Sequence, residues 1–412
     1  MRVVNICTAT QERSPGTVCL KMAATISSVQ CMGKITENEM QRQTDVITSI
    51  KPIALPKGVK KLCELCKKPA FMQCLQCRVT FYCGSDHQTS DWEGIHDQIC
   101  TQLIPLRSPE PHFSTESKRK EHADELFQQK RQLLQLTRAV GQKLLFEGKA
   151  EKAIPAVLQS LHFAIEVYGL SSIELVTSYL MLAEACIGLH RLKEAEDYLS
   201  QAQWTVLMVP DCDYRIKSQV HRQIGRLCEV KGDYEEALRH LAEDVYHCSI
   251  VTSTDDVETS GGYFHMGNIF LKLGKTDKAE TLYYRVLKIW HKYLTGIVTF
   301  NVEEEEKSSS LLTSPKMINL GKAQEAEAVK VLSAIHAWYS EMSDRHQLEF
   351  SYSCKTQALL NFVIGDRSQA KVCAERALEA LGDDEKKQHT RRAIASFLNL
   401  CRTTPQPSLS RR

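Results

Sequence analysis

The feature that most constrains this chain is a run of closely spaced cysteine and histidine pairs between residues 63 and 100. The four pairs are Cys63 and Cys66, Cys74 and Cys77, Cys83 and His87, and His96 and Cys100. Two residues separate the partners in the first two pairs, and three separate them in the last two. Such a pair supplies two ligands from one tight turn, and two pairs complete a tetrahedral zinc site. The spacing therefore predicts two zinc ions with no ligand left over.

Metal is expected to hold this segment folded. A segment this short buries too little apolar surface to fold alone, whereas a structural zinc site contributes roughly 10–16 kcal/mol of apparent binding free energy to folding. The alternative is a chance cluster of reduced thiols, which the metal-like spacing of all four pairs disfavours. Because four protein ligands leave no position for water, both zinc ions are expected to be structural and not catalytic.

The order Cys-x2-Cys, Cys-x2-Cys, Tyr-Cys-x3-His and Gln-x3-Trp-x3-His-x3-Cys resembles a MYND-type zinc finger. In that family the ligand pairs interleave. The resemblance implies one zinc held by Cys63, Cys66, Cys83 and His87, and a second held by Cys74, Cys77, His96 and Cys100. Most members carry cysteine where this chain has His87. Histidine is also a zinc ligand, so we expect that site to survive with one negative charge fewer.

The same resemblance implies a peptide-binding surface. MYND fingers bind short proline-rich peptides beside the helix that carries a glutamine and a tryptophan, which are Gln88 and Trp92 here. The alternative is that Trp92 simply packs on the second zinc site. The sequence leaves both interpretations open.

The composition limits which classes of protein this chain can belong to. The 412 residues suffice for two or three domains, and 52 basic residues nearly balance 50 acidic ones, which gives no support for nucleic-acid or membrane-surface binding. Six of the 16 cysteines belong to the finger and the rest show no regular pairing. With no signal peptide and no apolar run of about 20 residues, the sequence predicts a reducing intracellular compartment and no membrane helix.

Segments with little pattern flank the finger. Residues 1–58 are expected to form a disordered or optional extension, and residues 59–102 the finger. Residues 103–120 are predicted to be a linker, because Pro105, Pro109 and Pro111 forbid one continuous helix. The basic run at residues 118–120 is read as a solvated helix start, with a nuclear-localisation signal as the alternative.

A 42-residue period runs through residues 121–300 and predicts four helical hairpins. Four sets of equivalent positions, here called columns, recur every 42 residues. They are the alanines 153, 195, 237 and 279; the small residues Gly141, Ala183, Gly225 and Gly267; the turn residues Gly148, His190, Gly232 and Gly274; and the large residues Val157, Leu199, Leu241 and Tyr283. Small side chains are needed where paired helices approach closely, and glycine ends a helix at low cost. The units resemble tetratricopeptide repeats, lengthened by about a turn per helix as in kinesin light chains.

The remaining segments are less regular. Residues 301–316 are predicted to be an acidic, serine-rich insertion closed by Pro315, and residues 317–402 further degenerate repeats with a capping helix. Residues 403–412 are expected to be a disordered tail. The predicted fold is therefore mainly α: a small two-zinc finger followed by an α-solenoid of long helix hairpins.

The sequence carries no motif of a known catalytic site. It has no phosphate-binding glycine loop, nucleophile elbow or His-Glu-x-x-His pair. We therefore expect a non-catalytic adaptor. A lysine methyltransferase of the SET-and-MYND type is disfavoured, because the segments flanking the finger show no SET pattern. A nuclear corepressor adaptor is a further alternative, supported only by the basic run.

Over most of its length the chain also resembles a family of ciliary and sperm-flagellar proteins that join a MYND finger to tetratricopeptide repeats. The resembling segments include FYCGSDHQTSDWEGIHDQIC, LLFEGKAEKAIPAVLQSLHF, QAQWTVL and TSGGYFHMGNIF. The resemblance implies an axonemal assembly component without enzymatic activity. Its expected partners are other tetratricopeptide or dynein-associated proteins, and its expected location is the cytoplasm, cytoskeleton and ciliary or flagellar axoneme.

Overall fold

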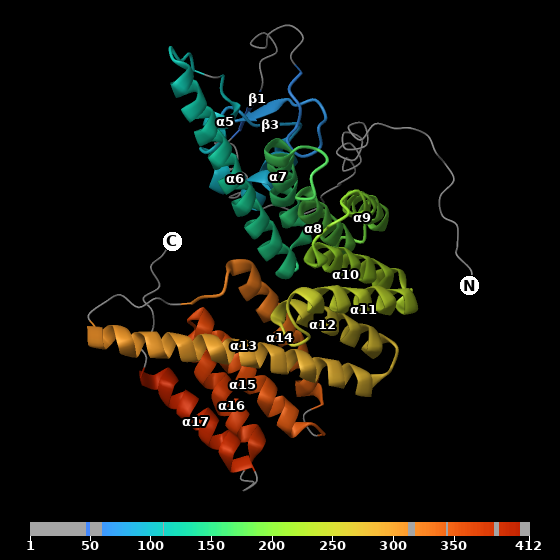
Figure 1. The fold of residues 1–412 in the computed structure, drawn as a ribbon, viewed down its shortest axis with the longest axis vertical. Coiled ribbons are helices and arrows are strands. Elements are labelled where there is room, and N and C mark those ends of the chain that lie inside the picture. The colour runs from blue at the N-terminus through green and yellow to red at the C-terminus, as the bar shows by residue number, and fades with distance from the viewer. Residues whose placement is uncertain are drawn as a thin grey trace. The chain divides into compact units, whose positions relative to one another are not determined.

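The computed structural model describes residues 47–49, 60–109, 111–311, 318–342, 345–382 and 387–403 (Figure 1). Most of the predicted N-terminal extension and of the C-terminal tail lies outside the described residues. The chain divides into two compact units: residues 1–145 with 149–210, and residues 146–148 with 211–412.

The first unit begins with the finger. Strands β1 (Ile47–Ser49), β2 (Met72–Cys74) and β3 (Phe81–Tyr82) form an antiparallel sheet in the order β1-β2-β3. Helix α3 (Ser85–Asp91), the wide helical turn η2 (Trp92–His96) and helix α4 (Asp97–Ile99) follow without a break. Strand β1 comes from the segment that the sequence predicts to be an optional extension; it pairs Thr48 with Gln73.

Two helical hairpins complete the first unit. Helix α6 (Glu116–Phe146) packs with α7 (Ala150–Tyr168), and α8 (Leu175–Gly188) packs with α9 (Leu192–Leu207). Helix α8 is buried nearly all round, as its run of apolar residues requires. Helix α7 contacts α8, so the two hairpins pack against each other.

The second unit is entirely helical in its described residues. Its helices are α10 (Tyr214–Lys231), α11 (Tyr234–Val251), α12 (Val257–Lys272), α13 (Thr276–Leu311), α14 (Lys322–Glu341), α15 (Gln347–Ile364), α16 (Arg367–Leu381) and α17 (Gln388–Thr403). One core cluster of this unit contains Trp290 and Tyr339, both fully buried. Among the described residues, no helix is long and apolar enough to cross a membrane.

The 42-residue period is visible in the turns between paired helices. All four predicted turn residues, Gly148, His190, Gly232 and Gly274, have a positive φ between 56° and 85°. In each case the next residue donates its N–H to the carbonyl five positions earlier. These bonds are Lys149 to Leu144, Arg191 to Cys186, Asp233 to Cys228 and Lys275 to Phe270, at 2.8–2.9 Å. One helix-ending motif is thus repeated four times at the predicted step.

In three of the helix pairs, the predicted small residue faces the predicted large residue of the partner helix. A Cβ atom added to Gly225 would lie 2.9 Å from Cγ of Leu241, and one on Gly267 would lie 2.7 Å from Cε1 of Tyr283. The same holds in the first hairpin, where a Cβ on Gly141 would meet Cγ2 of Val157 at 2.7 Å. The prediction of a stack of paired helices is confirmed, because the large residue of one helix fills the space left by glycine on its partner.

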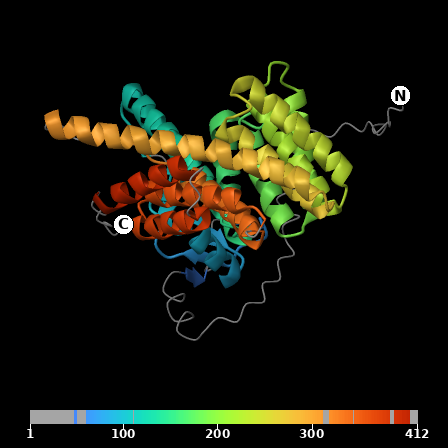
Figure 2. The ribbon, with the colours of Figure 1, turned by 90° about the horizontal axis from the view of Figure 1, so that it is seen from below.

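Besides strand β1, the structure differs from the sequence-based boundaries in the predicted insertion and in the predicted linker. Helix α13 continues through the predicted insertion as far as Leu311 (Figure 2), because the stretch of glutamates and lysine after residue 302 contains no helix breaker before Pro315. The predicted linker contains helix α5 (Leu103–Arg107), with Pro105 inside its first turn, where proline is tolerated.

Candidate metal centre

Two knuckles of identical geometry begin the site. Each Cys-x2-Cys pair is followed by a basic residue in the left-handed region, Lys67 with φ 58° and Arg78 with φ 60°. The N–H of each donates to the carbonyl of the first cysteine of its pair, Cys63 or Cys74, at 3.0 Å. This turn directs both thiols of a pair to the same side, which is the arrangement of a zinc knuckle.

The first tetrad consists of Cys63, Cys66, Cys83 and His87. The Sγ atoms of Cys66 and Cys83 lie 3.6 Å apart, and His87 Nδ1 lies 3.1 Å from Cys83 Sγ and 3.4 Å from Cys63 Sγ. Cys63 and Cys66 are buried, whereas Cys83 and His87 are partly exposed. Histidine at position 87 therefore reaches the common centre through Nδ1.

The second tetrad consists of Cys74, Cys77, His96 and Cys100, all buried. The Sγ atoms of Cys74 and Cys100 lie 3.8 Å apart, and His96 Nε2 lies 3.7 Å from Cys77 Sγ. The structure thus brings together the residues in the interleaved grouping that the family resemblance implies. Helix α3 places His87, and the turn after it places His96, which explains how pairs distant in sequence alternate between the sites.

The geometry fits zinc. A tetrahedral ion with Zn–S bonds of about 2.3 Å requires sulfur–sulfur separations of about 3.8 Å, and the two Sγ–Sγ separations of 3.6 and 3.8 Å are close to this. In each tetrad the ligand atoms all lie within 4.8 Å of one another. Because four protein ligands fill the coordination of each ion, the two ions are structural. Among the described residues, these are the two groups of Cys, His, Asp and Glu close enough to hold a metal.

Asp91 supports the second tetrad through the side chain of His96, and the sequence did not reveal this role. Its Oδ2 lies 3.5 Å from His96 Nδ1 and accepts a hydrogen bond of 2.7 Å from the Tyr82 hydroxyl. All three side chains are buried, and burial raises the pKa of Asp91 to about 6. A carboxylate beside the outer nitrogen of a zinc-bound histidine fixes the ring and its tautomer. An acidic residue five positions before a ligand histidine is the sequence signal that could have identified it.

A second missed residue is Glu64, which lies inside the first knuckle. Arg107 donates two hydrogen bonds to its carboxylate, at 2.7 and 3.0 Å, and Gln159 donates a third at 2.6 Å. Burial disfavours the charged carboxylate, but the charge and hydrogen bonds of Arg107 outweigh this and hold the pKa of Glu64 at about 2. The partners lie 43 and 95 residues away, so no local pattern could reveal them.

The two residues proposed for peptide contact lie on consecutive helical segments, Gln88 on α3 and Trp92 on η2. Gln88 is 3% exposed. Trp92 is half-buried, with its ring centroid 5.7 Å from that of His96. Trp92 therefore packs on the second tetrad in this structure, while a peptide contact at these residues stays a prediction.

Comparison with known proteins agrees with this geometry. Residues 63–100 match the MYND finger family. Over 46 residues the chain is 46% identical to Programmed cell death protein 2 of Rattus norvegicus, covering 11% of this chain and 13% of that protein. Over 151 residues it is 23% identical to Protein KINESIN LIGHT CHAIN-RELATED 1 of Arabidopsis thaliana, covering 37% of this chain and 24% of that protein. The matches thus span a quarter or less of these relatives. The chain carries a MYND zinc finger with two structural zinc sites, followed by a helical repeat region with a distant kinesin light chain-related relative.

Proposed function

We propose that this chain is a non-catalytic scaffold that binds other proteins. The observation that carries the proposal is that both metal sites are closed by four protein ligands. A zinc ion with no open position neither activates water nor polarises a substrate. The metal centre then contributes shape, and the helical hairpins contribute extended surface of the kind that repeat proteins use for protein partners.

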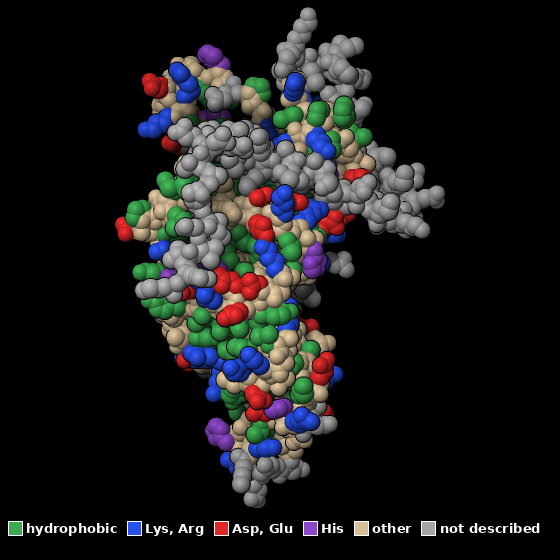
Figure 3. Space-filling view, turned by 90° about the vertical axis from the view of Figure 1, so that its right-hand side faces the viewer, with side chains coloured by type: hydrophobic (Ala, Val, Ile, Leu, Met, Phe, Trp, Pro, Cys, Tyr) green, Lys and Arg blue, Asp and Glu red, His purple; other side chains and the backbone are tan. Residues whose placement is uncertain are grey.

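The surface of helix α9 supports protein binding. Trp204, Leu207 and Met208 are 58%, 77% and 62% exposed. Their i, i+3, i+4 spacing places them on one face of the last helical turn. Tryptophan and methionine are enriched at protein interfaces, and a contiguous exposed apolar group marks interaction sites. On the side seen in Figure 3, described side chains of both charges are interspersed with apolar ones, unlike the single-sign field that attracts a polyanion.

A more specific proposal concerns the cellular location of the chain and its binding partners. The family resemblance of the sequence favours a component of the ciliary or sperm-flagellar axoneme that is needed for flagellum assembly and motility. Its partners would be other tetratricopeptide or dynein-associated proteins. A nuclear corepressor adaptor is the alternative, and the basic run at residues 118–120 favours it.

Proximity labelling in ciliated or germ cells tests this choice. The full chain is fused to a labelling enzyme and compared with the double variant Trp204→Asp, Leu207→Asp. Glu196→Ala on the same helix serves as the control. Axonemal neighbours that disappear in the double variant but remain in the control support the proposal. Chromatin neighbours would favour the nuclear alternative.

Catalysis has its own test, because a methyltransferase must bind S-adenosylmethionine. We expect no saturable binding of this cofactor to the zinc-loaded full chain by calorimetry. Saturable binding at micromolar concentration would contradict the scaffold proposal.

A further inference from the structure

The helical half of the finger lies directly against helix α7 of the first hairpin. Gly94, in the turn η2, is buried, and a Cβ atom added there would lie 2.8 Å from the backbone carbonyl oxygen of Lys152. The same Cβ would lie 3.0 Å from two side-chain atoms of Pro155. The finger therefore approaches the backbone of α7 so closely that only glycine fits between them.

A buried polar contact joins the same two parts. Gln159 of α7 is 2% exposed, and its amide donates to Glu64 in the first zinc knuckle at 2.6 Å. Arg107 donates to both oxygens of that carboxylate, at 2.7 and 3.0 Å, and also to the Thr80 hydroxyl at 3.3 Å. If the finger moved away, the buried side chains of this group would lose their partners, which costs more than the bond itself contributes.

Apolar packing continues the contact to the metal ligands. Leu158 of α7 packs against a buried cluster that contains five of the six cysteine ligands and Tyr82. At the rim, Lys152 pairs with Glu93 at 2.8 Å, with both side chains about half exposed, so this pair adds little. The interface thus has a glycine contact, a buried polar group and an apolar contact on one face of α7.

We infer that α7 is the permanent partner of the finger within the chain, so that the two zinc ions stabilise the first helical hairpin as well as the finger. The finger acts as the N-terminal cap that a helical stack needs at its end. This inference goes beyond the scaffold proposal and does not depend on which partner the chain binds. It also implies that the side of the finger formed by η2 is closed to an outside peptide while α7 stays docked.

Hydrogen exchange of the zinc-loaded full chain, read by mass spectrometry, tests the docking. In Gly94→Ala the added methyl group must displace α7, so amide exchange in α7 is expected to rise about tenfold, while zinc content stays at two per chain. Gly84→Ala is the matched control, because a Cβ at Gly84 has no atom within 4 Å. Equal exchange of α7 in the two variants would overturn the inference.

Zinc removal gives a second readout that needs no variant. When a chelator strips zinc from the wild-type chain, exchange is expected to rise in α7 along with the finger. Helix α11, in the other unit, serves as the internal reference and is expected to keep its protection. If α7 kept its full protection after both ions were lost, the finger would not stabilise the hairpin and the inference would fail.

Discussion

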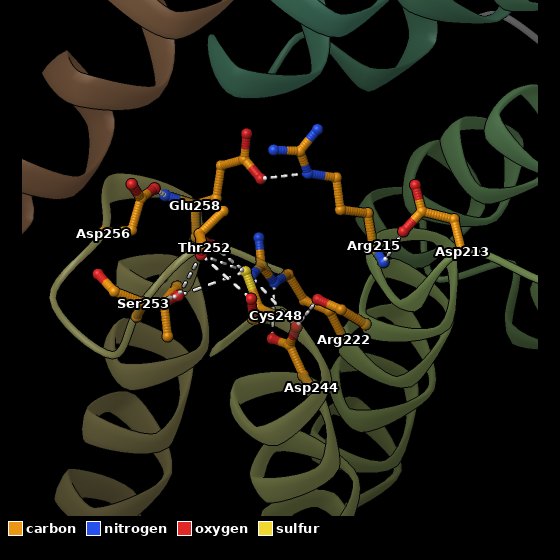
Figure 4. Close-up of polar contacts among 11 residues, drawn as sticks. Asp213, Arg215, Arg222, Asp244, Cys248, Thr252, Ser253, Asp256 and Glu258 are labelled. Carbon is orange, nitrogen blue, oxygen red and sulfur yellow. Dashed lines mark hydrogen bonds and ion pairs between the residues drawn. The ribbon is translucent and has the colours of Figure 1, made fainter. Parts of the chain in front are cut away.

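The buried carboxylate of Asp244 is expected to be the most sensitive single position in the second unit. It lies on α11 with no exposed surface, and Arg222 of α10 donates to its two oxygens at 2.7 and 3.2 Å (Figure 4). Ser218 donates a further hydrogen bond at 2.5 Å. Arg222 also donates to the carbonyl of Glu258 at 2.8 Å, so one ion pair links three helices.

Asp244→Asn keeps the size of the side chain but leaves Arg222 without its counter-charge. Burial disfavours the Arg222 cation, and the charge and hydrogen bonds of Asp244 nevertheless hold the pKa of Arg222 above its usual value. Removing one partner of a buried pair costs about 3–5 kcal/mol. Because the Arg222 side chain is 18% exposed and reaches some water, we expect the lower end, about 3 kcal/mol.

The loss is measured by urea unfolding, with hydrogen exchange reporting on α11 and α12 separately from the first unit. The matched control is Glu236→Gln, which removes an exposed pair with Arg239 on the same helix and is expected to cost less than about 1 kcal/mol. The double variant Asp244→Asn, Arg222→Met should recover part of the loss. If Asp244→Asn cost no more than the control, the account of this buried pair would be wrong.

Three further outcomes are expected. A chelator should remove zinc from the partly exposed first tetrad about tenfold faster than from the second, because Asp91 supports only His96 in the second site. Native mass spectrometry of Cys83→Ser, compared with wild type, identifies which site loses its zinc first. Earlier loss of zinc from the buried second site would refute this prediction. His190 is exposed with φ 56°, so His190→Gly should raise stability by about 0.5–1 kcal/mol in urea unfolding, and a destabilised variant would contradict the turn assignment. Burial, together with the charge of Lys355, lowers the pKa of His291 to about 4. Between about pH 6.5 and 4 the unfolded chain then binds a proton that the folded chain does not, so stability falls on acidification, by up to about 3 kcal/mol; in His291→Asn this part of the pH dependence should be absent.

What the sequence could predict follows from local spacing. The zinc ligands are spaced for turns of a few residues, and the repeat columns recur at 42 residues because each hairpin has to bury the same two faces. The positive φ of His190 shows how strong that constraint is, since the chain adopts a glycine-like turn even without glycine. The repeat period and the residues at the turns were therefore sufficient to predict the paired helices.

What the sequence missed depends on contacts between distant residues. Gln159 reaches Glu64 across 95 positions, and nothing near either residue indicates the pairing. The docking of Gly94 on Lys152 likewise depends on how two elements meet in space. The continuation of α13 is a different case. Acidic and polar composition suggested an insertion, yet glutamate and lysine are good helix formers, so the helix continues.

The measurement that tests the account most directly is the zinc content of the purified full chain, determined by elemental analysis alongside native mass spectrometry. The account predicts two zinc ions per chain, and fewer than two in Cys74→Ser, with the helical signal of the repeats largely retained. A chain that folds without bound zinc, or a Cys74→Ser variant that still holds two ions, would contradict it.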